Sequence, residues 1–443
     1  MRKNILLELR EGIIAGITPL AGGQRPVGEE VDDLSHCTLV PALVDCSLYL
    51  GRSPSIGNQA GASVSDHRAP PFAAISPAYA GQYAALVARH IQYCLAHGVL
   101  GGADNDDLSA LFLGGAATDV GNGSAHAAGK AASGKMFPDA ANKTAMPTQL
   151  RGPALSQLLA LLRGHLPGGG MELRLPIPYC AGGHKASRGG SPHSHDTFQN
   201  RANLPPLHNF FRLFYSNSPN IIENSSLTSP AISQTQLRRL LQHKGVAKAV
   251  VVANGRQQVA EALDAGCDAI EQGYDMGEDN LRKMAEMNVL WIPSLLRAKN
   301  ALDGACGGGD VCCRFSQRYV APGKPNPEAE AFWRETLTRQ LAQLAMAREL
   351  GVKTVVGTGA GSVGILHGES VSEEIKLFIK AGYSLEESIR CASTNGAEFF
   401  GMERLGPLTI GRPATFLITR GTAQQLPRKL SYLEDIYING TPG

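Results

Sequence analysis

The sequence predicts an α/β protein: a (βα)8 TIM barrel with a small β-sandwich that the two ends of the chain build together. Two observations predict this fold. Apolar, strand-like runs alternate with helical patterns through residues 41–403. Residues 1–40 and 404–443 contain short strand-like runs punctuated by Gly and Pro. We therefore expect a first part of the sandwich at 1–40, the barrel at 41–403 and the second part of the sandwich at 404–443.

The terminal segments and the insertions are predicted from short-range patterns. Apolar runs bounded by turn residues predict strands at Ile5–Leu9, Gly12–Ile17, Val31–Leu34, Thr38–Val40, Ala414–Thr419 and Asp435–Asn439. Irregular insertions are expected near 51–80 and 114–147, which are rich in Gly, Ala and Ser, and near 180–200, which is polar and rich in His.

The barrel elements follow from periodicity. Val246–Ala253 is a continuous apolar run, as expected of a strand that is buried on both faces. Further strands are expected at Cys267–Glu271, Val289–Ile292 and Lys353–Val356, and helices at Arg256–Ala265, at Asp279–Met287 and from Pro327 to about Leu350.

Helix starts have recognisable chemistry. Asn326 followed by Pro327 is typical of a helix start, because Asn accepts from first-turn amides and Pro lacks an N–H that the first turn would leave unpaired. Three Ser-x-x-Glu/Gln patterns predict capping boxes, at Ser233–Gln236, Ser370–Glu373 and Ser384–Glu387.

Composition excludes several classes of protein. A net charge of +2 without Lys/Arg runs argues against nucleic acid or an acidic membrane as partner. No apolar stretch is long enough to span a bilayer, and charges interrupt the apolar start of the chain, which argues against a signal peptide. Nine scattered cysteines fit reduced thiols, so we expect a cytoplasmic protein.

Several segments carry motifs that occur together in one enzyme family. They are Pro41–Leu50, Val252-Ala-Asn254-Gly, Ala265–Gly273, Gly357-Thr-Gly359-Ala-Gly-Ser362 followed by His367-Gly-Glu369, Ala392–Ala397 and Leu408–Ala414. In this order they resemble the imidazolonepropionase/prolidase-like branch of the amidohydrolase superfamily. The likeness covers the first 50 residues and the chain from about 215 onward. It implies a metal-dependent hydrolase of non-peptide or dipeptide C–N bonds, in which divalent metals activate a water molecule.

The resemblance also shows that the family's metal ligands are replaced. Ser47 and Tyr49 stand where the family has a His-x-His pair. Val252 and Gln272 replace histidines on strands five and six, and Gly359 replaces the strand-eight aspartate that is both ligand and proton acceptor. For strand four we expect the stretch 220–223, which offers Glu223 but no lysine. Valine and glycine have no donor atom, and serine and glutamine are poor zinc ligands.

These substitutions lead to two hypotheses. The first is a degenerate amidohydrolase, a pseudoenzyme without a cofactor that binds a small molecule or an unknown protein partner. Candidate pocket residues are then Asn254, Glu271, Ser362, His367 and Glu369. The second is an active C–N hydrolase whose zinc site is rebuilt from the polar insertion, with His184, His193, His195 and Asp196 as ligands. Assembly into a homo-oligomer stays open, as does the identity of the substrate or ligand.

Three other patterns carry less weight. Gly359-x-Gly361-x-x-Gly364 matches a dinucleotide-binding fingerprint, but no second strand ending in an acidic residue follows it. Ser362, His367 and Glu369 lie too close in sequence for a hydrolase triad and lack a nucleophile elbow. Cys306 with Cys312-Cys313 lacks the second paired half of a zinc site.

Overall fold

A computed structural model gives the fold of most of the chain. It describes residues 4–20, 31–54, 77–106, 170–177, 179–180, 197–198, 208–215, 232–306, 325–362 and 364–442. The predicted insertions at 114–147 and at most of 51–80 and 180–200 therefore lie outside the described residues.

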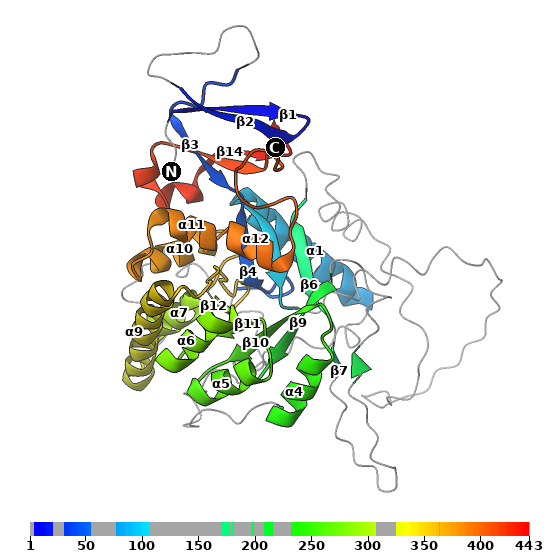
Figure 1. Ribbon diagram of the computed structural model, residues 1–443, viewed down its shortest axis with the longest axis vertical. Helices are drawn as coiled ribbons and strands as arrows, with labels where there is room; N and C mark the ends of the chain where they lie inside the picture. The colour runs from blue at the N-terminus through cyan, green and yellow to red at the C-terminus, as the bar shows by residue number, and fades with distance from the viewer. Residues whose placement is uncertain are drawn as a thin grey trace, which may run out of the picture.

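A parallel sheet of seven strands forms the centre of the molecule (Figure 1). Its strands follow one another in space in the order in which they occur in the chain, as in a barrel. They are β4 (Leu43–Leu48), β5 (Val99–Asp104), β6 (Glu172–Pro176), β9 (His208–Phe214), β10 (Lys248–Ala253), β11 (Ala269–Gln272) and β12 (Leu290–Ile292). Strand β10 is buried beyond its first residue, which confirms the strand predicted from its apolar run.

The segment 353–356 closes the sheet into a barrel. On one side it accepts a backbone hydrogen bond from Trp291 of β12 through the Lys353 carbonyl. On the other side the Val356 carbonyl accepts from the Cys46 amide of β4 at 2.9 Å. The strand predicted at Lys353–Val356 is thus extended backbone in the eighth barrel position, although it has only an isolated bridge.

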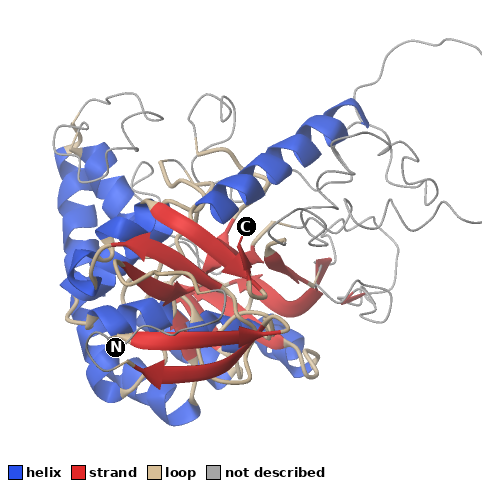
Figure 2. Cartoon of the chain, turned by 90° about the horizontal axis from the view of Figure 1, so that it is seen from above, coloured by secondary structure: helices blue, strands red, loops and turns tan. Residues whose placement is uncertain are grey.

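Helices lie on the outside of these strands, as Figure 2 shows from above. They are α1 (Pro77–Ala96), α4 (Gln234–Gln242), α5 (Arg256–Asp264), α6 (Glu278–Met287), α7 (Leu295–Ala305), α9 (Pro327–Leu350), α10 (Ser370–Lys380), α11 (Leu385–Cys391) and α12 (Thr394–Phe400). The alternation of strands and helices confirms the predicted TIM-barrel class.

Small antiparallel sheets join the two ends of the chain beside the barrel (Figure 1). One sheet has the order β15-β14-β13-β3, so that an early strand pairs with late ones. Its strands are β3 (Cys37–Pro41), β13 (Phe416–Arg420), β14 (Leu433–Ile438) and β15 (Thr441–Pro442); β1 (Ile5–Arg10) and β2 (Ile13–Pro19) form a separate hairpin. The remaining short elements are β7 (Tyr179–Cys180), β8 (Thr197–Phe198), η5 (Ala423–Gln425) and η6 (Arg428–Ser431). The strand predicted at Val31–Leu34 was wrong, because that segment has no ladder partner.

Most of the predicted helix caps are present. Ser233 and Ser384 form complete capping boxes, and the Asn326 side chain accepts from the Ala329 amide at 3.1 Å. The box predicted at Ser370 was wrong. Glu369 is the N-cap of α10, and the Ser370 hydroxyl instead accepts from the Leu366 amide of the preceding loop.

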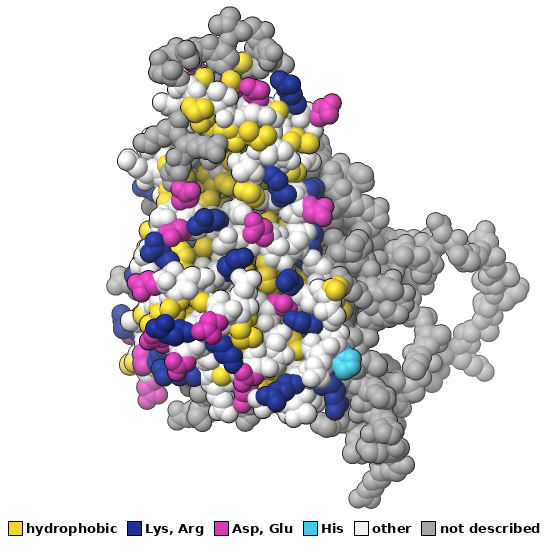
Figure 3. Space-filling view, in the orientation of Figure 1, with side chains coloured by type: hydrophobic (Ala, Val, Ile, Leu, Met, Phe, Trp, Pro, Cys, Tyr) yellow, Lys and Arg dark blue, Asp and Glu magenta, His cyan; other side chains and the backbone are white. Residues whose placement is uncertain are grey.

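Acidic and basic side chains alternate on the face drawn in Figure 3 rather than gathering by sign. Along α9, Arg334 forms an ion pair with Glu330 one turn earlier. Within the described residues, no helix combines the length and the apolar character needed to cross a bilayer.

A buried carboxylate fixes the start of α7. Glu374 of α10 is fully buried and accepts from the Leu295 and Leu296 amides, at 2.7 and 2.8 Å. These amides belong to the first turn of α7, whose N-cap residue Ser294 offers them no side-chain bond.

Glu374→Ala is therefore expected to lower the free energy of unfolding by about 2 kcal/mol or more, because it leaves two buried donors unpaired. Urea denaturation measures this loss. The neighbouring Glu373→Ala removes only a partly exposed ion pair with Lys376 and should cost about 1 kcal/mol or less. Equal effects of the two exchanges would contradict the capping role.

Candidate functional site

The carboxyl ends of the barrel strands bring several predicted positions together. The Gly359 amide donates to the Ser47 carbonyl at 2.7 Å, and the Ser47 hydroxyl donates to Glu271 Oε1 at 2.7 Å. Val252 of β10 pairs with Glu271 of β11 in the ladder. This end of a parallel barrel is where enzymes of this architecture place their active sites, so it is the candidate site.

An ion pair fills the centre of this site. Arg212 of β9 donates through Nε and Nη2 to both carboxylate oxygens of Glu271, at 2.8 and 2.7 Å. Their side chains are 2% and 1% exposed. Burial lowers the pKa of Arg212, but the negative charge of Glu271 outweighs it and raises the pKa, so Arg212 stays charged.

Arg212 corrects the prediction for strand four. The fourth strand of the barrel is β9, His208–Phe214, so placing it at 220–223 with Glu223 was wrong; Glu223 itself lies outside the described residues. The residue that this strand sends into the site is a cation. A lone Arg between Phe211 and Leu213, matched by a lone Glu in another apolar run, was the sequence signal for a buried pair.

Tyr49 lies among three guanidinium groups. Its hydroxyl accepts from Arg212 Nη2 at 3.2 Å and from Arg297 Nη1 at 3.5 Å, and the Arg52 guanidinium lies 4.0 Å above the ring. The ring is buried, which favours the neutral phenol, but the charges of Arg212 and Arg297 outweigh burial and lower the pKa of Tyr49. Arg52 is itself paired with the buried Asp106 at 3.0 Å.

Gly359 makes room for Arg297. Its φ is +71°, and a Cβ added here would lie 3.0 Å from Cδ of Arg297 and 3.2 Å from Cγ. Any larger side chain would therefore press on the arginine stem as well as adopt a left-handed backbone. The family resemblance implies an aspartate at position 359, but this chain has Gly359, and the stem of Arg297 packs against it.

Ser47 and Asp45 have all their bonds within the scaffold. The Ser47 hydroxyl also accepts from Asn105 Nδ2 at 2.9 Å. Asp45 accepts from the Thr358 amide and hydroxyl, at 2.9 and 2.5 Å, and from the Ser47 amide at 3.2 Å. Burial raises the pKa of Asp45 to about 7. These bonds tie β4 to the segment after 353–356.

The positions on β10 and β11 are also committed to structure. Val252 is buried and has no polar side-chain atom. Gln272 has a φ of +71°, and its Oε1 accepts from Asn254 Nδ2 at 2.7 Å. Asn254 in turn accepts from the Tyr274 amide at 3.2 Å. The predicted pocket residues Asn254 and Glu271 are thus at the strand ends, and both have partners inside the protein.

His367 contacts the backbone of the site at Tyr49. Its Nε2 donates to the Tyr49 carbonyl at 3.0 Å, and its ring stacks on His90 with centroids 3.8 Å apart. Nδ1 of His90 donates to the neighbouring Leu50 carbonyl at 2.7 Å. Burial and the neighbouring His90 lower the pKa of His367 to about 3, so it is neutral. The pair fixes the chain that follows β4.

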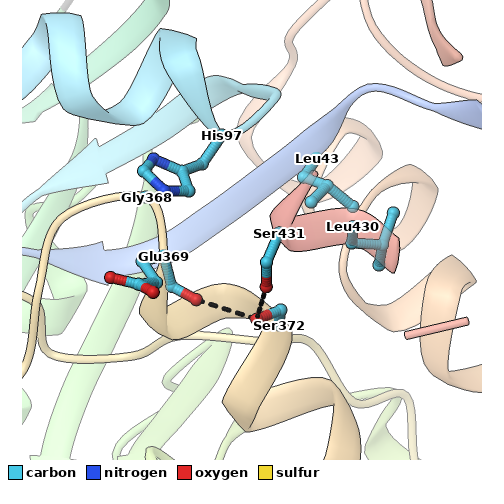
Figure 4. A pocket seen from close by; sticks show the side chains of 7 residues that line it. All are labelled: Leu43, His97, Gly368, Glu369, Ser372, Leu430 and Ser431. Carbon is cyan, nitrogen blue, oxygen red and sulfur yellow. Dashed lines mark hydrogen bonds between the residues drawn. The ribbon is translucent and has the colours of Figure 1, made fainter. Parts of the chain in front are cut away.

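Glu369 lines a different hollow, between the end of α1, the start of α10 and η6 (Figure 4). The lining residues are Leu43, His97, Gly368, Glu369, Ser372, Leu430 and Ser431. The hollow is too small to enclose a water molecule. Leu43 begins β4 whereas Ser47 lies near its end, so this hollow is away from the candidate site.

Ser362, another predicted pocket residue, lies close to Gly359 at the candidate site. Its amide donates to the Gly359 carbonyl at 3.0 Å.

Residues 228–438 match the family model described as "Amidohydrolase family". This match covers slightly less than half of the chain, and it agrees with the resemblance noted in the sequence. An uncharacterized protein of Mycobacterium tuberculosis is 28% identical over 139 residues, which are 31% of this chain. A protein of Mycobacterium bovis matches to the same extent. The matches span only 33% of these curated relatives.

Several solved hydrolase structures share this fold. A Xaa-Pro dipeptidase with bound methionine has a TM-score of 0.62 at 16% identity, covering 98% of this chain and 93% of that chain. Phenylurea hydrolase B has a TM-score of 0.62 at 12% identity, covering 99% and 92%. An ochratoxinase of A. niger has 0.59 at 13% identity, covering 98% and 89%. At these identities the likeness concerns the fold.

The residues at this candidate site do not fit a divalent metal. The Ser47 hydroxyl donates to Glu271, and Arg212 donates to both oxygens of the same carboxylate. Among the described residues, no three His, Cys, Asp or Glu side chains come together as a metal site requires. The alternative ligands His184, His193, His195 and Asp196 lie outside those residues.

Proposed function

We propose that this amidohydrolase-family chain is a pseudoenzyme, a metal-free barrel that binds a small molecule and does not hydrolyse C–N bonds through an activated water. The observation that carries the proposal is the guanidinium of Arg212, which is held on Glu271 and Tyr49 at the strand ends. Loss of one ligand would only weaken metal binding, whereas a positively charged guanidinium at this place also repels a metal cation.

The size of this opposition follows from elementary electrostatics. Two unit charges 4 Å apart repel by about 4 kcal/mol at an effective dielectric constant of 20. Glu271 offsets the charge of Arg212, so a divalent ion here meets such repulsion chiefly from Arg297. The substituted positions supply no compensating thiolate or imidazole. The positive charges therefore support loss of the metal as a property of the whole site.

The second candidate, an active hydrolase with zinc held by His193 and His195, makes the opposite prediction. Its ligands come from the polar insertion, so it requires a metal that binds without the strand-end positions. The two candidates differ in metal content and in what histidine exchange does to it.

Elemental analysis of protein purified without chelator or metal-affinity resin tests this directly. We expect zinc, iron and manganese well below one ion per chain, also after incubation with excess zinc and gel filtration, and no cleavage of a Xaa-Pro dipeptide panel. One zinc per chain that disappears in a His193→Ala/His195→Ala variant would establish the alternative. Zinc that persists in that variant would contradict both.

A further inference from the structure

Within the part of the chain that the structure describes, the arginines at the strand ends outnumber the carboxylates that pair with them. Glu271 neutralises Arg212, and Asp106 neutralises Arg52. Arg297 forms no ion pair with a carboxylate among the described residues, and its Nη1 donates to the Tyr49 hydroxyl at 3.5 Å. Counted over the described residues, the three guanidiniums around Tyr49 exceed their paired carboxylates by one positive charge.

A buried donor is also left over. Arg212 uses Nε and Nη2 for Glu271 and Tyr49, while Nη1 is buried and has no hydrogen-bond partner within the described residues. An unpaired N–H of a charged group inside a protein costs more than an ordinary lost bond, so it calls for a partner such as water or an ion. The adjacent positive charge selects an anion.

Tyr49 completes the donor set. Its oxygen accepts from both Arg212 and Arg297, so both guanidiniums reach the same hydroxyl. Its own proton has no recorded acceptor in the described part of the chain and can be donated to a ligand oxygen. Gly359 keeps this arrangement possible, because a side chain there would displace the Arg297 stem.

We propose that this site binds the carboxylate group of a small monoanionic molecule, held between Arg297 and Nη1 of Arg212 with Tyr49 as a further donor. The spare charge of one matches a carboxylate and not a phosphate dianion. Guanidinium groups suit this ligand because they donate in pairs to planar oxyanions. The inference rests on the proposed metal-free function and names the class of its ligand.

Saturation-transfer NMR, which detects weak binding, tests the proposal on the full chain. The probes are acetate, N-acetylproline and its uncharged analogue N-acetylprolinamide, with inorganic phosphate as competitor. We expect both carboxylates to bind in a saturable and mutually competitive way, and the amide to bind about tenfold or more weakly.

Variants separate this site from general surface charge. Arg297→Met is expected to weaken acetate binding about tenfold or more, Arg297→Lys to retain part of it, and Arg282→Met, which removes an equal charge from an exposed position of α6, to leave it unchanged. Circular dichroism spectra confirm that each variant is folded.

Three outcomes would overturn the inference: equal binding of the acid and the amide, unchanged binding in Arg297→Met, or a preference for phosphate over acetate. Its failure is distinguishable from failure of the proposed function. If the protein is metal-free but does not bind carboxylates, only the proposed ligand class is refuted. If it contains one zinc per chain, the pseudoenzyme proposal is refuted.

Discussion

Replacing Arg212 by methionine is expected to lower the free energy of unfolding by about 3–5 kcal/mol. The exchange keeps an apolar side chain of similar length beside Phe214 but leaves Glu271 buried without its cation. Among the described residues, the Ser47 hydroxyl would then be the one donor left to that carboxylate, which is too little to hold a charge in the barrel.

The double variant Arg212→Met/Glu271→Leu serves as the control. Removing both charges replaces the pair by apolar packing, which is often neutral or stabilising, so most of the lost stability should return. Urea unfolding of the four proteins in this cycle gives the coupling energy. A single variant that loses less than about 1 kcal/mol would show that the pair is not buried as described.

The second large effect concerns acid and His367. Its folded pKa of about 3 lies below the ordinary value of 6.5, so between these values the unfolded chain binds the extra proton. Its contribution to stability is present above pH 6.5 and is lost as pH falls toward 3. Asp45 and Glu374 act in the opposite direction, because burial raises their pKa values to about 7 and about 8.

A variant isolates the histidine from these carboxylates. His367→Gln keeps a donor for the Tyr49 carbonyl but cannot titrate. The stability difference between the original protein and this variant should shrink by about 2 kcal/mol between pH 7.5 and pH 5. Chemical denaturation at several pH values measures it. His243→Gln, at an exposed histidine, is the control; an equal change there, or none at His367, would contradict the buried neutral stack.

The parts of this fold that could be predicted are those set by short-range patterns. The run at 246–253, the cap at Asn326 and the boxes at Ser233 and Ser384 depend on neighbours a few residues away. Ser370 shows where this fails. It has the sequence of a capping box, but its hydroxyl is drawn to the Leu366 amide by the loop that also carries His367.

The sequence predicted that the metal ligands are lost at this site, but it did not predict the arginines that occupy their place. Substitution at Ser47, Val252 and Gly359 is visible in the sequence. The partner of Glu271 was not, because Arg212 lies 59 positions away and strand four had been placed after it. Arg297 was missed for a similar reason: its role depends on Gly359 leaving space across the barrel, which only the fold shows.

Crystals soaked in zinc and measured at the zinc absorption edge test the central claim most directly. We predict no anomalous peak among Ser47, Tyr49 and Gly359, with Arg212 still on Glu271. A peak in that space, with Arg212 turned away, would contradict the claim that guanidinium groups replace the metal. A peak coordinated by His193 and His195 would instead support the active hydrolase and contradict the pseudoenzyme.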